Sequence, residues 1–115
     1  MNRVLFLLIL FGCPSIPSHG ASVQENWSNL CLKCHGPYGD GKTKEGRRLR
    51  AKDYTDPKVQ AAFSDSGLLR NLLLGVDNPD AADDGRMPSF KEKLSIGEAK
   101  ELIILIRSFN KGPGK

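Results

Sequence analysis

This sequence has little of several features that would point to common classes of protein. Of its 115 residues, three are cysteine, two are histidine and one is tryptophan. Its first long apolar run, residues 4–11, is too short to span a bilayer, so the protein is not expected to be transmembrane. Lys and Arg give a net charge of only +4, whereas a nucleic-acid-binding domain usually carries a stronger basic excess. The length allows one domain of ordinary globular composition.

The first residues have the pattern of an export signal. Arg3 precedes the apolar run, and small residues at positions 18 and 20 fit cleavage before Ala21. We therefore expect a signal peptide over residues 1–20 and one domain over residues 21–115, located in the periplasm. The run that ends at Cys13 also resembles a lipobox. The alternative is a lipoprotein signal over residues 1–12, with a lipid anchor on Cys13.

Cleavage before Ala21 leaves two cysteines, and both lie in the run Cys31-Leu32-Lys33-Cys34-His35. This C-x-x-C-H pattern is typical of covalent haem attachment, in which two thiols bond to the porphyrin and the histidine binds the iron. A structural zinc site needs four ligands, but the processed chain has only three Cys and His residues. A thioredoxin-like motif needs a βαβ pattern, and a disulfide across so short a loop would stabilise little.

A second protein ligand for the iron would have to come from the residues that remain. Without Met1, Met87 is the single methionine, and His35 is already used. Pro88 disfavours a helical conformation at Met87, and the polar residues before it are untypical of a core segment. Met87 is therefore the expected second axial ligand. The alternatives are a lysine ligand, an open iron position, or a Met87 that only fills the core.

These motifs follow the order found in small bacterial class I c-type cytochromes, and the chain resembles this mono-haem family over residues 24–109. The most specific features are the glycines at 36, 39 and 41 after the haem motif and the run Met87-Pro88-Ser89-Phe90. The resemblance implies an all-α, cytochrome c-like fold of about four helices and long loops around one covalent haem c with its iron. Many members have a proline in the segment that corresponds to residues 45–49, and its carbonyl accepts the histidine ring N–H. This chain has none there, so that acceptor is left unassigned.

Helical periodicity and capping residues predict the same fold. Helices are expected over residues 23–32, from Pro57 after a cap at Asp56, and from residue 64 or 65 to Gly75. The last helix is the clearest, because Ser95 and Glu98 form a capping box before a run with helical apolar spacing. Residues 76–86 are expected to form a polar loop, and no strand is expected.

With His35 and Met87 both on the iron, no position remains for a substrate. The expected function is therefore outer-sphere transfer of one electron, and not enzymatic catalysis. The partners would be redox proteins, one electron donor and one acceptor. Two alternatives stay open: a dedicated cytochrome subunit of a larger oxidoreductase complex, and a haem enzyme or gas sensor with an open iron position.

Basic residues crowd the segment over residues 42–52. One interpretation is a set of solvated loop charges. The other is functional: Arg47, Arg48 or Lys52 contacts a haem propionate, and the remaining charges attract an acidic partner. Tyr54 is a further candidate for a propionate contact.

Overall fold

The structure is a computed structural model of the whole chain, and it describes residues 9, 12, 20–79, 81 and 85–111. The predicted signal peptide over 1–20, apart from residues 9, 12 and 20, lies outside the described residues. The alternative lipid anchor at Cys13 lies outside them as well. Among the residues that are described, no helix has both the length and the apolar character that a membrane span requires.

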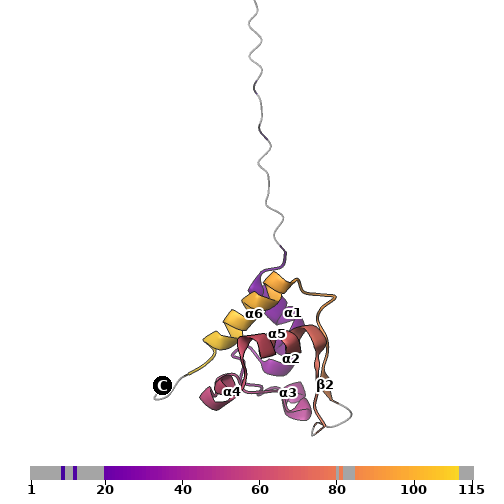
Figure 1. Cartoon of the computed structure of the whole chain (residues 1–115), viewed down its shortest axis with the longest axis vertical. Helices are drawn as coiled ribbons and strands as arrows, with labels where there is room; N and C mark the ends of the chain where they lie inside the picture. Colours follow the sequence, from indigo (N-terminus) through magenta and orange to yellow (C-terminus); the bar gives the residue numbers. More distant parts are fainter. Residues whose placement is uncertain (1–8, 10–11, 13–19, 80, 82–84, 112–115) are drawn as a thin grey trace, which may run out of the picture.

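The described part of the chain is mainly helical, which confirms the predicted all-α class (Figure 1). In chain order it forms α1 (Val23–Leu30), α2 (Leu32–His35), α3 (Lys44–Leu49), α4 (Pro57–Ala62), α5 (Asp65–Leu74), β1 (Val76–Asp77), β2 (Arg86–Met87) and α6 (Ile96–Ser108). Helix α6 packs against both α1 and α5. In the view of Figure 1, α1 and α6 lie above α5, and α2, α3 and β2 are drawn below it.

The expected caps are confirmed. Asp56, Ser64 and Ser95 each accept a backbone N–H from the first turn of α4, α5 and α6. The capping box of Ser95 and Glu98 has both of its hydrogen bonds. Gly75 ends α5 with a φ of 78°, a conformation that glycine adopts without strain.

Three local expectations are corrected. The helix expected over residues 23–32 ends at Leu30, because Cys31 leaves helical geometry with a φ of −123° before α2 begins. Helix α3 was not expected, since a short polar segment has no apolar period. The strand-free expectation is wrong for two residue pairs: Val76 is paired with Met87, and Asp77 with Arg86, in an antiparallel ladder that closes the base of the polar loop.

The core contains most of the apolar side chains that the helical periods predict, although Ile96, at the start of the period in α6, is exposed. Its members from α1 and α6 include Trp27, Leu102 and Ile106, and Leu102 is fully buried. The Trp27 ring also meets Phe109, with ring centroids 5.1 Å apart. Leu68 and Leu72 of α5 belong to the same buried cluster. Helix α2 follows α1 directly and packs against it.

Candidate functional site

A cavity brings together most of the residues that the sequence singles out. Its empty space, counted together with its open mouth, is about 990 Å³. The predicted site residues that line it are Cys31, Cys34, His35, Lys52, Tyr54 and Met87. Leu30, Leu49, Phe63, Val76 and Phe90 contribute apolar walls. Arg47 and Arg48 do not line it.

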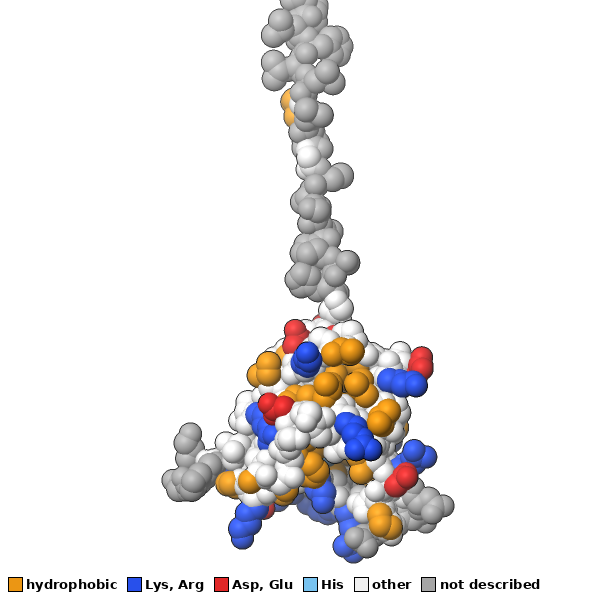
Figure 2. All heavy atoms as spheres, viewed as in Figure 1, with side chains coloured by type: hydrophobic (Ala, Val, Ile, Leu, Met, Phe, Trp, Pro, Cys, Tyr) orange, Lys and Arg blue, Asp and Glu red, His pale blue; other side chains and the backbone are white. Residues whose placement is uncertain are grey.

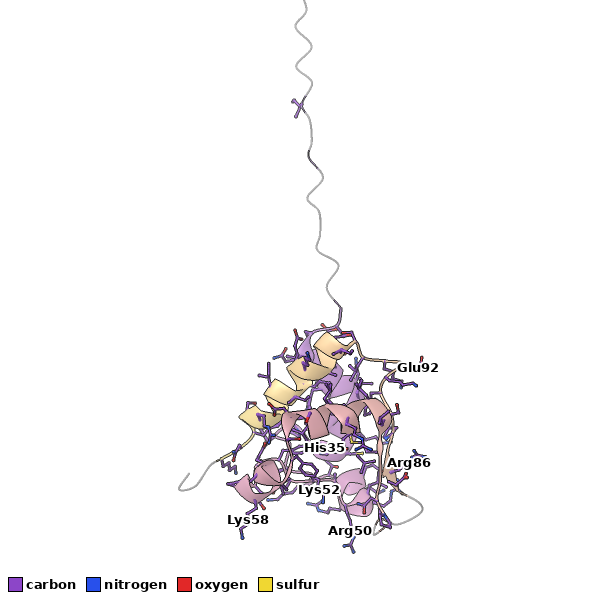
Figure 3. All side chains as sticks on the ribbon, viewed as in Figure 1. His35, Arg50, Lys52, Lys58, Arg86 and Glu92 are labelled. Atoms are coloured by element: carbon purple, nitrogen blue, oxygen red, sulfur yellow. The ribbon has the colours of Figure 1, made fainter. Side chains whose placement is uncertain are left out.

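His35 is the last residue of α2 and is buried, with 9% of its surface exposed (Figure 3). Its Nδ1 lies 3.3 Å from the carbonyl oxygen of Lys52. Because a carbonyl can only accept, Nδ1 carries the proton and Nε2 keeps its lone pair. Burial lowers the pKa of His35, while the Lys52 carbonyl acts in the opposite direction. The ring is therefore a neutral imidazole, the form that binds a metal ion.

Two aromatic rings fix the orientation of the imidazole. Tyr54 stacks on His35 with ring centroids 5.0 Å apart and an interplanar angle of 26°. The Trp27 ring is tilted against His35, with centroids 6.0 Å apart, and its Nε1 donates to the carbonyl of Gly36 at 3.0 Å. Burial raises the pKa of Tyr54 to about 12, so its phenol stays protonated. The imidazole thus contacts residues that are distant from it in sequence.

The chain reaches His35 from residues 51–52 because Gly41 permits a close backbone approach. Its N–H donates to the His35 carbonyl at 2.9 Å. With a φ of 70°, Gly41 occupies the left-handed region, and a Cβ there would lie 2.8 Å from the Ala51 carbonyl oxygen. A side chain at this position would push residues 51–52 away from the imidazole.

A second close approach joins α2 to α3. The Thr43 hydroxyl lies 2.8 Å from the carbonyls of Lys33 and Cys34, and it accepts the Gly46 N–H at 2.8 Å. A Cβ on Gly46 would lie 2.2 Å from the Cys34 carbonyl oxygen, so only glycine fits. Helix α3 is therefore placed directly against the helical turn that carries the two thiols.

Both thiols of the C-x-x-C-H motif belong to the cavity. Cys31 is buried and Cys34 half-buried, and neither is in a disulfide. Burial raises the pKa of Cys31 to about 12, and it also raises the pKa of Cys34. Both side chains are therefore neutral thiols at neutral pH. Among the described residues, no group of three or more His, Cys, Asp or Glu side chains could hold a metal ion.

Met87 lies at the end of β2 and is half-buried. Its extended conformation agrees with the expectation drawn from Pro88 that it lies outside any helix. The backbone around it is held against the end of α5: the Ser89 hydroxyl donates to the Leu73 carbonyl at 2.5 Å, and the Phe90 N–H donates to the Leu72 carbonyl at 2.9 Å. This short segment places the thioether on the cavity that His35 also lines.

The basic residues divide into two sets. Arg50, Lys52 and Arg86 are exposed and line the cavity (Figure 3). Arg86 pairs at 3.5 Å with Asp77, which also lines the cavity. Arg48 does not line it and bonds Glu45 within α3, at 2.8 Å. Arg50 and Arg86 were missed as site residues: Arg50 ends α3 in the left-handed conformation, which glycine or asparagine usually marks, and only the β1–β2 pairing places Arg86. Figure 2 shows Lys and Arg side chains spread over the visible face, and several of them lie at its lower end.

These residues fit a covalently bound haem. The cavity presents two thiols that can bond to a porphyrin, and a neutral imidazole and a thioether that suit its iron. Apolar side chains form much of the remaining wall, as a porphyrin requires. The Lys52 carbonyl supplies the acceptor that metal-binding histidines usually have on their second nitrogen.

Comparison with known proteins gives the family. No family model and no curated protein matches this chain. Among solved structures, it is similar to the c-type cytochrome KustC0563, with 30% identity and a TM-score of 0.64 over 79% of this chain and all of that one. A mutant of the same protein matches with 30% identity and a TM-score of 0.60, over 76% of this chain and 98% of that one.

The helices and the cavity therefore define a cytochrome c-like fold, and the predicted fold is confirmed. The chain belongs to the c-type cytochromes. Membership in this family implies covalently bound haem with its iron, and it indicates electron transfer as the general function.

Proposed function

We propose that this chain is a class I mono-haem cytochrome that carries single electrons between redox proteins in the periplasm. The observation that supports it most is the single cavity shared by Cys31, Cys34, His35 and Met87. Cys31 and Cys34 would hold the haem through thioether bonds, and His35 Nε2 and the Met87 thioether would bind its iron. When bound, the haem supplies a one-electron Fe(II)/Fe(III) couple.

The residues around these four favour electron transfer over substrate binding at the iron. The Lys52 carbonyl and the Tyr54 ring hold the imidazole in one orientation. Apolar walls that include Phe63 and Phe90 limit the access of water, which disfavours the additional charge of Fe(III). With two protein ligands no position is left for a substrate, so we propose an electron carrier and not an enzyme.

The charges at the mouth of the cavity support an acidic redox partner. Arg50, Lys52 and Arg86 come from two separate segments and lie around the same opening, where Asp77, paired with Arg86, is the one acidic lining residue among those described. Lys52 and Arg50 are the best-placed contacts for haem propionates, with Tyr54 as a further candidate, whereas Arg47 and Arg48 would act only at longer range. Opposite charges on a partner would steer it to this opening.

Salt tests the partner proposal. The rate of electron transfer to an acidic partner should fall steeply as ionic strength rises, because screening shortens the range of these charges. Arg86→Gln should reduce this dependence, and Lys91→Gln, an exposed residue that does not line the cavity, is the matched control. A salt-independent rate with the native partner would contradict the proposed steering.

Intact mass and the optical spectrum of the exported protein test the function. The mass should correspond to residues 21–115 plus one haem, and the ferric spectrum should be low-spin with a far-red sulfur-to-iron band. A high-spin ferric spectrum, or rapid binding of carbon monoxide to the reduced protein, would instead support a haem enzyme or gas sensor. A mass that corresponds to a chain starting at a lipidated Cys13 would contradict only the expected cleavage before Ala21.

A further inference from the structure

A buried amide lies just outside the cavity. Gln60 of α4 is 5% exposed and does not line the cavity. Its Nε2 donates to the carbonyls of Tyr54 at 2.7 Å and Ile106 at 2.8 Å, and its Oε1 accepts from Arg107 at 2.9 Å. Both partners of Nε2 are acceptors and the partner of Oε1 is a donor, so only one orientation of the amide satisfies all three bonds. The side-chain amide of Gln60 therefore has one defined orientation.

The segment that Gln60 holds is the one that contacts His35. Lys52 gives its carbonyl to the imidazole, and Tyr54, two residues later, gives its ring. The backbone of Tyr54 is tied on both sides: its N–H donates to the Gly39 carbonyl at 2.7 Å, and its carbonyl accepts from Gln60. We call residues 52–54 the histidine strap.

Helix α6 anchors the other end of this network. Ile106 is a buried core residue. Arg107 also bonds the carbonyls of Gln60 and Phe63, at 2.6 and 2.5 Å, and its Nε donates to Asp65 at 2.9 Å. Gln60 thus connects the histidine strap to a capped helix that belongs to the core. Without its two N–H donors, the Tyr54 carbonyl would lose this partner, and the Ile106 carbonyl would keep the Phe109 N–H at 3.2 Å.

We propose that Gln60 is a positioning residue for His35, because it holds the histidine strap in the place where the Lys52 carbonyl accepts the imidazole N–H. The hydrogen bond on Nδ1 makes the imidazole more basic and so tunes the metal that it binds. Its length of 3.3 Å is at the upper limit for such a bond, so a small displacement of the strap breaks it. The inference depends on the proposed function, since it takes His35 as the iron ligand.

The test compares two buried amides in the haem-loaded protein. Gln60→Met keeps the length of the side chain and removes its hydrogen bonds. Asn26→Leu is the matched control: Asn26 is also 5% exposed, but its bond, 3.0 Å long, goes to Glu98 and not to the histidine strap. The readouts are hydrogen exchange of the His35 ring N–H, followed by NMR in the reduced state, and the midpoint potential.

Gln60→Met should exchange the ring proton about fivefold faster, as expected for one weakened hydrogen bond. Its potential should become more positive, because a less basic imidazole stabilises Fe(III) less. Asn26→Leu should lower the melting temperature but should change neither the exchange of the ring proton nor the midpoint potential. If Gln60→Met does not fold, Gln60→Glu keeps the acceptor for Arg107 and should show the faster exchange.

Unchanged exchange in the Gln60 variant that folds, or equal changes in Asn26→Leu, would overturn the inference while the haem spectrum stays intact. A protein without covalent haem would overturn the proposed function as well, so the two failures are distinguishable.

Discussion

The two proposed iron ligands are held in different ways. His35 receives contacts from Trp27 on α1 and from Lys52 and Tyr54, so its place depends on segments far apart in sequence. Met87 depends on the two-residue strand pair and on bonds from the two residues after Pro88 to the end of α5. The histidine side is built into the fold, whereas the methionine side is attached locally. We therefore expect Met87 to leave the iron first when the protein is stressed.

Removal of the haem should have the largest effect on stability, because the segments around His35 and around Met87 both line the cavity that would hold it. The variant with Cys31→Ala and Cys34→Ala should bind no covalent haem and should lose cooperative unfolding, since a cavity of this size would be left inside a small domain. Thermal unfolding followed by circular dichroism measures this. A haem-free protein that melts as cooperatively as the loaded one would contradict the expectation.

The next largest effect on stability is expected when a methyl group is added at Gly46, where α3 packs against the helix that ends at His35. Gly46→Ala would put a Cβ 2.2 Å from the Cys34 carbonyl oxygen, and the free energy of unfolding should fall by about 3 kcal/mol. Gly97→Ala on α6 is the control, because the nearest atom to its new Cβ is 3.8 Å away. Denaturant titration of both variants gives the values. Equal stabilities would show that α3 is not packed tightly against α2.

A smaller change is expected on the methionine side. Ser89→Ala removes the bond to the Leu73 carbonyl, which should cost about 1 kcal/mol of stability. The sulfur-to-iron band should then be lost at a lower concentration of added imidazole than in the wild type. Ser108→Ala, which removes a bond to the Leu105 carbonyl near the end of α6, should leave that titration unchanged. A response to Ser108→Ala as large as that to Ser89→Ala would remove the distinction between the two sides.

Much of the helical frame was predictable from the sequence, because caps such as Asp56 and Ser95 act on their own first turns. The thiols and His35 were predictable from one short motif. The Lys52 acceptor was not, since every residue has a carbonyl and only the close approach at Gly41 selects this one. The strand pair was also missed, because two residues are too few to show an alternating pattern.

The basic residues at the mouth of the cavity also show what the sequence alone could not predict. The sequence singled out a basic segment, but it could not tell that Arg48 pairs with Glu45 while Arg50 turns to the cavity. That division depends on the left-handed conformation of Arg50. Arg86 was beyond sequence reasoning for another reason, because it reaches the same opening from a distant segment through the pairing of β1 with β2.

The spectrum of Met87→Ala tests the central claim most directly. The wild-type ferric protein should be low-spin with a sulfur-to-iron band, and the variant should lose that band and become high-spin, while the haem stays attached through Cys31 and Cys34. Reduced Met87→Ala should also bind carbon monoxide rapidly. A variant with the same ferric spectrum as the wild type would show that Met87 is not an iron ligand, and the account of a closed, two-ligand electron carrier would be wrong.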